Sequence, residues 1–172
     1  AKYNECAAIC NDLIGSGYTL EGKYLDNFAA DNNTSTELIF GLQSDGTVTQ
    51  NYGATTVMVN GSVGSLEQNG TSLGVSAAAW GGALRLRKQF VQKFGGSDFE
   101  NDTRNTITSG SRNIEIMDIA NRDQGYILTK YSNISSTGQA GPNTTFVDAD
   151  FVLFRLADVY LMYAECAVRG AS

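Results

Sequence analysis

The chain has 172 residues, a length that suits one domain with a buried core. Its content of 42% hydrophobic and 17% charged residues is typical of a globular protein and excludes general disorder. A formal net charge of −6 argues against nucleic acid as a partner, and the absence of histidine excludes imidazole bases, nucleophiles and metal ligands.

The first predicted element is a helix over residues 2–14. Apolar and small residues recur there at spacings of three and four, namely Tyr3, Cys6, Ala7, Cys10, Leu13 and Ile14. Gly15 or Gly17 can take the left-handed conformation that ends a helix. Cys6 and Cys10 lie one turn apart, a spacing that suits either a metal or a helix interface. We favour core packing, because the chain lacks the further ligands that a zinc site needs.

A strand is expected next, in "TELIFGL" at residues 36–42, closed by the turn signal "SDG". Residues 47–79 are polar, small and punctuated by glycine. Within them "TTVMVNGSV" predicts a β-hairpin around Asn60-Gly61, since Asn-Gly suits a type I′ turn. A long stretch of this kind inside a globular protein is usually functional or disordered.

Residues 82–94 are predicted to form a helix with Ala83, Leu86, Phe90 and Phe94 on one side. Alternation predicts strands in "NIEIMDI", residues 113–119, and in "GYILTKY", residues 125–131. Between them and the helix, "SDFENDTR" crowds Asp98, Glu100 and Asp102, which suggests either calcium or a turn. A contact between Asp102 and Arg104 in a turn is favoured, because the glycine and distal glutamate of an EF-hand loop are missing.

The closing segment, "FVLFRLADVYLMYAECAVRG" at residues 151–170, predicts a helix that is apolar over most of its surface. Its polar residues share one narrow stripe, Arg155, Asp158, Glu165 and Arg169. Such a helix needs neighbours on two sides, an arrangement that stacked helical repeats provide. We expect the opening helix to be one neighbour and the array to continue beyond this chain. Asp148 and Asp150 are expected to lie at the helix N-terminus.

Four segments in this order resemble the SusD/RagB family, the outer-membrane nutrient-binding lipoproteins of Bacteroidetes-type bacteria. The strongest is "DADFVLFRLADVYLMYAECAVRG". The others are "YNECAAICNDLIGSGYTLEGKYLDNFAADNNTSTELIFGL", "WGGALRLRKQFVQKFGGSDFENDTR" with its Asp102 and Arg104, and "GYILTKYSN".

The resemblance implies a mainly α fold, in which a tetratricopeptide-like helical scaffold carries a loop-rich insertion with short strands. Residues 1–17 and 147–172 would be repeat helices, the second truncated, and residues 18–146 the insertion with its helix near 82–94. The family captures a glycan at the cell surface and delivers it, uncleaved and without a cofactor, to a SusC-like TonB-dependent transporter in the outer membrane. A lipid anchor upstream of this chain would supply the only membrane association.

A sugar presents apolar C–H faces edged by hydroxyls, so its site needs an aromatic platform with planar amides or guanidinium groups beside it. Trp80, the only tryptophan, and Tyr52 are the candidate platforms. The candidate polar partners are Asn51, Asn60, Gln68, Asn69 and Arg85. Either aromatic residue can instead anchor a loop on the core, as large aromatic residues commonly do.

Two other functions stay open at this point. A helical-repeat module can bind a protein or peptide partner in its grooves. Hydrolysis of a glycosidic bond needs two carboxyl groups at a set separation, and no motif in the sequence marks such a pair.

Overall fold

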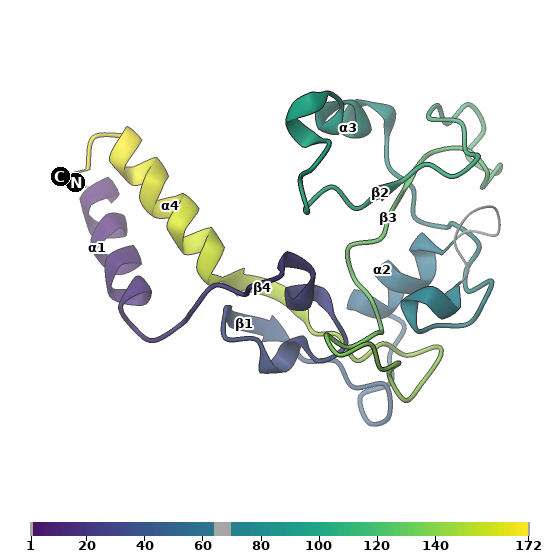
Figure 1. The fold of residues 1–172 in the computed structure, drawn as a ribbon, viewed down its shortest axis with the longest axis horizontal. Coiled ribbons are helices and arrows are strands. Elements are labelled where there is room, and N and C mark those ends of the chain that lie inside the picture. Colours follow the sequence, from purple (N-terminus) through teal and green to yellow (C-terminus); the bar gives the residue numbers. More distant parts are fainter. Residues whose placement is uncertain (1, 64–69, 172) are drawn as a thin grey trace.

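The computed structural model describes residues 2–63 and 70–171, which form a helical arm on a larger, loop-rich body. The arm consists of α1 (Lys2–Ile14) and α4 (Leu156–Val168), which run antiparallel side by side with both chain termini near their outer end (Figure 1). An antiparallel sheet of β1 (Leu38–Leu42) and β4 (Phe151–Arg155) connects the arm to the body.

The two helices of the arm share a small apolar core. Cys10, Leu156 and Val159 are buried there, and Cys6 and Leu13 pack against them. Burial raises the pKa of the Cys10 thiol, which keeps this group neutral as a packing residue. The predicted pairing of the opening and closing helices and the packing role of the cysteines are therefore confirmed.

The closing helix begins five residues later than the sequence predicts. Phe151–Arg155 is strand β4, paired with β1 so that Leu42 faces Phe151 and Leu38 faces Arg155. Three of the residues, Phe151, Val152 and Phe154, are aromatic or β-branched, a composition that suits a strand once a partner is present. The helix proper then begins at Leu156 with a capping box formed by Arg155 and Asp158.

The two aspartates that precede this segment do not serve the helix dipole as expected. Asp148 accepts a hydrogen bond from the backbone N–H of Gly46, and Asp150 accepts one from that of Ser44. The intervening strand β4 separates both carboxylates from the N-terminus of α4. They hold the loop after β1 instead.

The main core lies in the body and is built largely from residues of loops. Its buried members are Phe28, Val59, Val63, Leu73, Val75, Tyr131, Val147 and Ala149. Fully buried asparagines supply the hydrogen bonds that regular secondary structure would otherwise provide. The side chain of Asn133, for example, donates to the carbonyls of Gly74 and Asn143 at 2.9 Å each and accepts from the N–H of Asp148.

The hairpin expected around Asn60-Gly61 is wrong, because residues Ala54–Ser62 form helix α2. The helical register places Val59 and Val63, four residues apart, together in the core. Gly61 is needed for close packing rather than for a turn: a Cβ at this position would lie 2.7 Å from Cγ of Leu84.

The helix expected over residues 82–94 is shorter than predicted. Helix α3 covers Lys88–Val91 and continues as a 3₁₀ turn over Gln92–Phe94. The preceding residues are extended, because the N–H of Leu86 donates to the carbonyl of Tyr126 at 2.7 Å in a β-bridge. A backbone N–H engaged in a bridge to a distant segment is not available to a helix.

The strand predicted at residues 113–119 is also wrong. This segment is an irregular loop in which Met117 and Ile119 are exposed, and the side chain of Gln124 accepts hydrogen bonds from the N–H groups of Met117 and Asp118. The strand predicted within residues 125–131 is confirmed as the short β3 (Ile127–Leu128), which pairs with β2 (Ile107–Thr108). Further 3₁₀ turns cover Tyr24–Phe28, Asn32–Thr34, Gly70–Leu73 and Ser97–Phe99.

The expectation of a mainly α fold therefore holds only in part. Helix dominates the arm, whereas the body consists mostly of loops with short helices and strands (Figure 1). No helix within residues 2–63 and 70–171 has the length and hydropathy to span a bilayer.

Candidate functional site

Three aromatic side chains from distant parts of the chain gather on the surface of the body. The ring centroid of Tyr52 lies 6.3 Å from that of Trp80 and 5.1 Å from that of Phe146, and both pairs are tilted. Tyr52 is 65% exposed and Trp80 is half-buried. The structure thus brings the two predicted platform residues together, and we call Tyr52, Trp80 and Phe146 the aromatic surface.

Strained backbone lies beside both platform residues. Among the described residues, the non-glycine positions with positive φ are Ala54, at 46°, and Ala79, at 31°. Ala54 follows Tyr52 by two positions, and Ala79 directly precedes Trp80. A conformation of this kind costs about 1–3 kcal/mol and persists only where the surroundings enforce it, commonly at binding sites.

Main-chain hydrogen bonds fix the position of Trp80. Its N–H donates to the carbonyl of Asn60 near the end of α2, at 3.1 Å. Its carbonyl accepts a hydrogen bond from Nη1 of Arg122, at 2.8 Å. The indole is therefore carried by a turn that is held on both sides, which reduces the conformational entropy that ligand binding would otherwise remove.

The polar residues predicted to line the site mostly have structural roles. Asn60 is buried, and its amide donates to the carbonyls of Thr56 and Thr145 at 2.9 Å. The guanidinium of Arg85 donates to three carbonyls of the loop at residues 119–124. Both amide N–H groups of Asn60 and three donor contacts of Arg85 are thus used inside the protein, and ligand contact by these two residues stays a prediction.

Asn51 lies next to the aromatic surface in sequence, but its amide is engaged locally. Its Oδ1 accepts from the N–H of Gly53 and its Nδ2 donates to the carbonyl of Thr49, so the side chain stabilises the turn that carries Tyr52. Gln68 and Asn69 lie outside the described residues, and their roles remain predictions.

The loop before Tyr52 also carries an ionised side chain. Hydrogen bonds from the side chain and N–H of Thr47 and from the N–H of Val48 hold the pKa of Asp45 below its usual range. Asp45 therefore stays ionised at neutral pH. Its carboxylate orders residues 45–49, which lead into the aromatic surface.

Sequence reasoning missed Phe146 and Arg122. Phe146 is far from Tyr52 in sequence, and no local pattern connects the two residues. Arg122 lies in a loop where the arginine resembles an ordinary solvated residue. Their roles depend on tertiary contacts, so only the structure reveals them.

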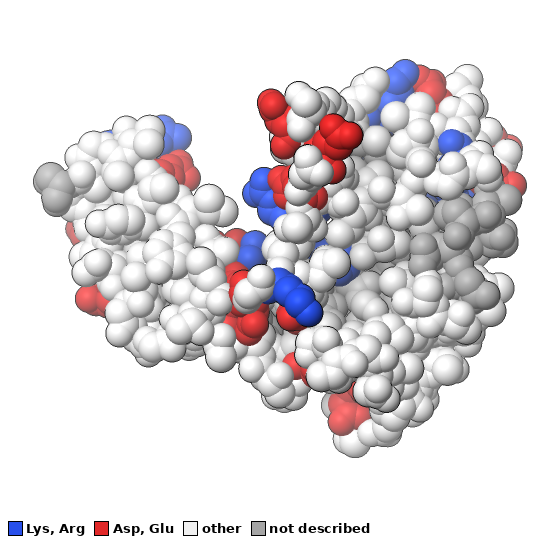
Figure 2. Space-filling view, viewed as in Figure 1, with Lys and Arg blue, Asp and Glu red and all other residues white. Residues whose placement is uncertain are grey.

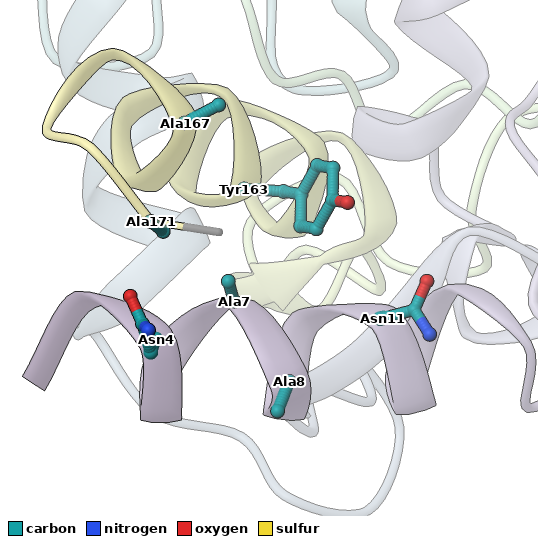
Figure 3. Close-up of a pocket in the computed structure, with 7 residues that line it drawn as sticks. All are labelled: Asn4, Ala7, Ala8, Asn11, Tyr163, Ala167 and Ala171. Atoms are coloured by element: carbon teal, nitrogen blue, oxygen red, sulfur yellow. The ribbon is translucent and has the colours of Figure 1, made fainter. Parts of the chain in front are cut away.

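A concave region lies between the arm helices. A groove of about 300 Å³ is lined by Asn4, Ala7, Ala8, Asn11, Tyr163, Ala167 and Ala171. In Figure 3, alanine side chains from both helices border this groove, with Tyr163 on one side and Asn4 and Asn11 on the other. Apolar residues elsewhere on the arm are also exposed to solvent, Leu161 to 66% and Val168 to 88%.

The charged residues show no metal-binding cluster in the part of the chain that the structure describes. Figure 2 shows charges of both signs along the notch between arm and body, while most of the arm is uncharged. Asp102 is bound by Arg104 at 2.6 Å, and hydrogen bonds from this arginine lower the pKa of Asp102 to about 2. The turn contact favoured over calcium is thus present, and no group of three acidic or cysteine residues is placed to hold a metal.

Comparison with known proteins identifies the family. The model of the SusD family matches residues 11–170, almost the whole chain. This chain belongs to the SusD family. The starch-binding protein SusD of Bacteroides thetaiotaomicron is 27% identical over an alignment 215 residues long. This alignment covers 97% of this chain and 38% of that protein. The chain therefore spans less than half the length of this SusD-family relative.

Solved structures show the same fold. Surface glycan-binding protein A from Bacteroides thetaiotaomicron, in complex with laminarihexaose, superposes with a TM-score of 0.64 at 22% identity, covering 99% of this chain and 40% of that one. A SusD superfamily protein from Parabacteroides distasonis gives a TM-score of 0.60 at 20% identity, covering 96% and 34%. At this level of identity, the likeness establishes the fold of this SusD-family chain.

Proposed function

We propose that this protein binds an oligo- or polysaccharide at the bacterial cell surface, without cleaving it. The observation that carries the proposal is the aromatic surface: the exposed Tyr52 and the half-buried Trp80 lie together on a strained and well-anchored backbone. Aromatic rings present the flat apolar face on which the C–H groups of a sugar can pack. Family relatives named for binding starch or crystallised with laminarihexaose support the assignment.

The proposed binding would be governed by stacking more than by charge. The rings of Tyr52 and Trp80 differ in plane by 38°, so a curved or twisted chain of sugars can contact both faces in succession. The hydroxyl of Tyr52 and neighbouring backbone groups offer hydrogen bonds to the sugar hydroxyls. A neutral ligand is therefore compatible with the aromatic surface.

We further propose that the captured glycan passes to a SusC-like TonB-dependent transporter, and that a lipid anchor outside these 172 residues attaches the protein to the outer membrane. Family membership supports both steps of this proposal. The same reasoning favours a non-catalytic role, because the relatives are named as binding proteins.

The arm suggests how this chain fits into a larger scaffold. We infer that α1 and α4 form one unit of a tetratricopeptide-like array, with further helices packed on their exposed faces. The groove lined by alanines supports this inference, because small residues allow another helix to approach closely. The division into repeat helices at residues 1–17 and 147–172 and an insertion at 18–146 remains part of the same proposal.

The groove also favours a second candidate function, the binding of a protein or peptide. Asn4, Asn11 and Tyr163 provide hydrogen-bonding groups around an apolar floor, which suits an amphipathic helix. This function and the scaffold role compete for the same surface.

Isothermal titration of the full-length protein against a panel of polysaccharides tests the proposal. Binding of at least one glycan, with no release of reducing sugar during incubation, is the expected result. Release of reducing sugar would indicate a glycosidase instead. Failure to bind any glycan, together with tight binding of a peptide or protein, would support the second candidate.

A further inference from the structure

A polar cleft lies beside helix α3, and none of its lining residues is among those considered for ligand binding so far. It has a volume of about 290 Å³ and is lined by Arg87, Lys88, Gln89, Gln92, Glu115 and Ile116. This volume approaches the lower end of the range for small-ligand sites, enough for one sugar unit. We call these six residues the α3 cleft.

The hydrogen-bonding groups of the α3 cleft are available to a ligand. Within the part of the chain that the structure describes, the guanidinium of Arg87 and the side-chain amides of Gln89 and Gln92 make no hydrogen bond or ion pair. Ile116 is 37% exposed and adds an apolar contact. Planar amides, a guanidinium and an apolar side chain together match the hydroxyls and C–H groups of a sugar.

The charges of the α3 cleft select among sugars. Lys88 forms an ion pair with Glu115, so these two charges neutralise each other. The charge of Arg87 remains uncompensated in the cleft, although the whole chain carries a net charge of −6. A guanidinium presents two parallel N–H groups that match a carboxylate, and this bidentate pairing is stronger than a bond to a neutral hydroxyl.

The α3 cleft and the aromatic surface share a supporting loop. Arg122 of the loop at residues 113–125 binds the carbonyl of Trp80, while Glu115 and Ile116 of the same loop line the cleft. Arg87 follows Trp80 by seven positions, so their Cα atoms lie at most about 25 Å apart. An oligosaccharide of several units is long enough to span that distance.

We propose that the α3 cleft is a subsite for a carboxylate-bearing sugar, a uronic acid residue, with Arg87 as its principal ligand. This inference rests on the proposed glycan-binding function and specifies the ligand as an acidic glycan. The aromatic surface stacks a neighbouring part of the same chain, and the two contacts together raise affinity above that of either alone.

The test uses the full-length protein and acidic oligosaccharides of three kinds: oligogalacturonate, oligomannuronate and glucuronoxylan fragments. Each is titrated beside its methyl-esterified form, which keeps the sugar and removes the charge. We expect at least one acid to bind about tenfold more tightly than its ester, and the variant Arg87→Gln to lose this preference. Lys93→Gln, which removes an exposed charge outside the cleft, is the matched control and should keep it.

Three results would overturn the inference. Equal affinity for acids and esters, or equal losses in Arg87→Gln and Lys93→Gln, would show that no specific carboxylate site exists. Binding of neutral glycans alone would have the same meaning while leaving the proposed function intact. Failure of every acidic and neutral glycan to bind would instead contradict the proposed function itself. Retained binding of a neutral glycan by Arg87→Gln shows that this variant is folded.

Discussion

The buried ion pair between Glu37 and Arg155 should govern how firmly the arm is attached to the body. Oε1 of Glu37 accepts from Nη1 of Arg155 at 2.7 Å, at the junction of β4 and α4. Oε2 accepts from the N–H of Glu21 at 2.9 Å and from the amide of Asn27 at 3.1 Å. The carboxylate is thus surrounded by donors, and Glu37 is only 3% exposed.

The substitution Glu37→Gln keeps the shape and removes the charge. The amide of the new side chain then faces at least one of the donors, which leaves a buried hydrogen bond unmade. Breaking a buried ion pair costs about 3–5 kcal/mol, but Asp158 lies 3.8 Å from Nε of Arg155 and partly compensates its charge. We therefore expect a loss of about 2–4 kcal/mol in the free energy of unfolding at neutral pH.

The pH dependence gives this prediction its sign. Burial alone would raise the pKa of Glu37, but the hydrogen bonds from Glu21, Asn27 and Arg155 outweigh it and lower the pKa below its ordinary value of 4.5. A carboxylate with a lowered pKa stabilises the folded state at pH values above its unfolded-state pKa. This stabilisation is lost as the pH falls through the folded-state pKa. The difference between wild type and Glu37→Gln should therefore narrow on acidification.

Urea titration at pH 7 and at about pH 3.5, on wild type, Glu37→Gln, Arg155→Met and the double variant, measures both effects. The double-mutant cycle isolates the pair from its other contacts. A coupling energy within about 0.5 kcal/mol of zero, or a penalty for Glu37→Gln that stays constant between the two pH values, would refute the reasoning.

Three further predictions concern the loops of the body. Asn133→Ala removes a fully buried side chain with hydrogen bonds to three residues and should destabilise by about 3–5 kcal/mol in urea titration, while the exposed Asn101→Ala should change little. Gly74→Ala should lower the free energy of unfolding by about 2 kcal/mol or more, because φ of Gly74 is +74° and a Cβ would collide with the backbone carbonyl of Asn133. Gly22→Ala is the control, because open space surrounds that position. Equal stability of the two variants would contradict the clash. Burial raises the pKa of Asp150, so the folded protein binds a proton on this carboxylate more tightly than the unfolded chain does. The free energy of unfolding should therefore fall as the pH rises from 3.8 through the raised pKa. If Asp150→Asn left the slope of stability against pH unchanged, this contribution would be excluded.

The arm was predictable because its information is local. Spacings of three and four residues place Cys6 and Cys10 on the apolar face of α1, and this face packs against α4 as the pattern indicates. The start of α4 was misplaced because residues 151–155 fit a helix as well as a strand by pattern alone. The deciding partner, β1, is more than a hundred residues away in sequence.

The body was less predictable because its order depends on buried polar side chains rather than on periodicity. Asn60 looked like a sugar ligand, whereas its amide satisfies carbonyls inside the core. Trp80 and Tyr52 were selected for their chemistry, and only the fold shows that they meet. Phe146 and Arg122, which complete and anchor the aromatic surface, carry no local signal.

The most direct test of the account is glycan affinity in variants of the aromatic surface. Trp80→Ala and Tyr52→Ala, measured by isothermal titration in the full-length protein against a glycan that the wild type binds, should each weaken binding at least about tenfold, as expected for central aromatic contacts. Tyr163→Ala in the groove of the arm should leave affinity unchanged. Full affinity in both surface variants would show that the glycan binds elsewhere and would contradict the account.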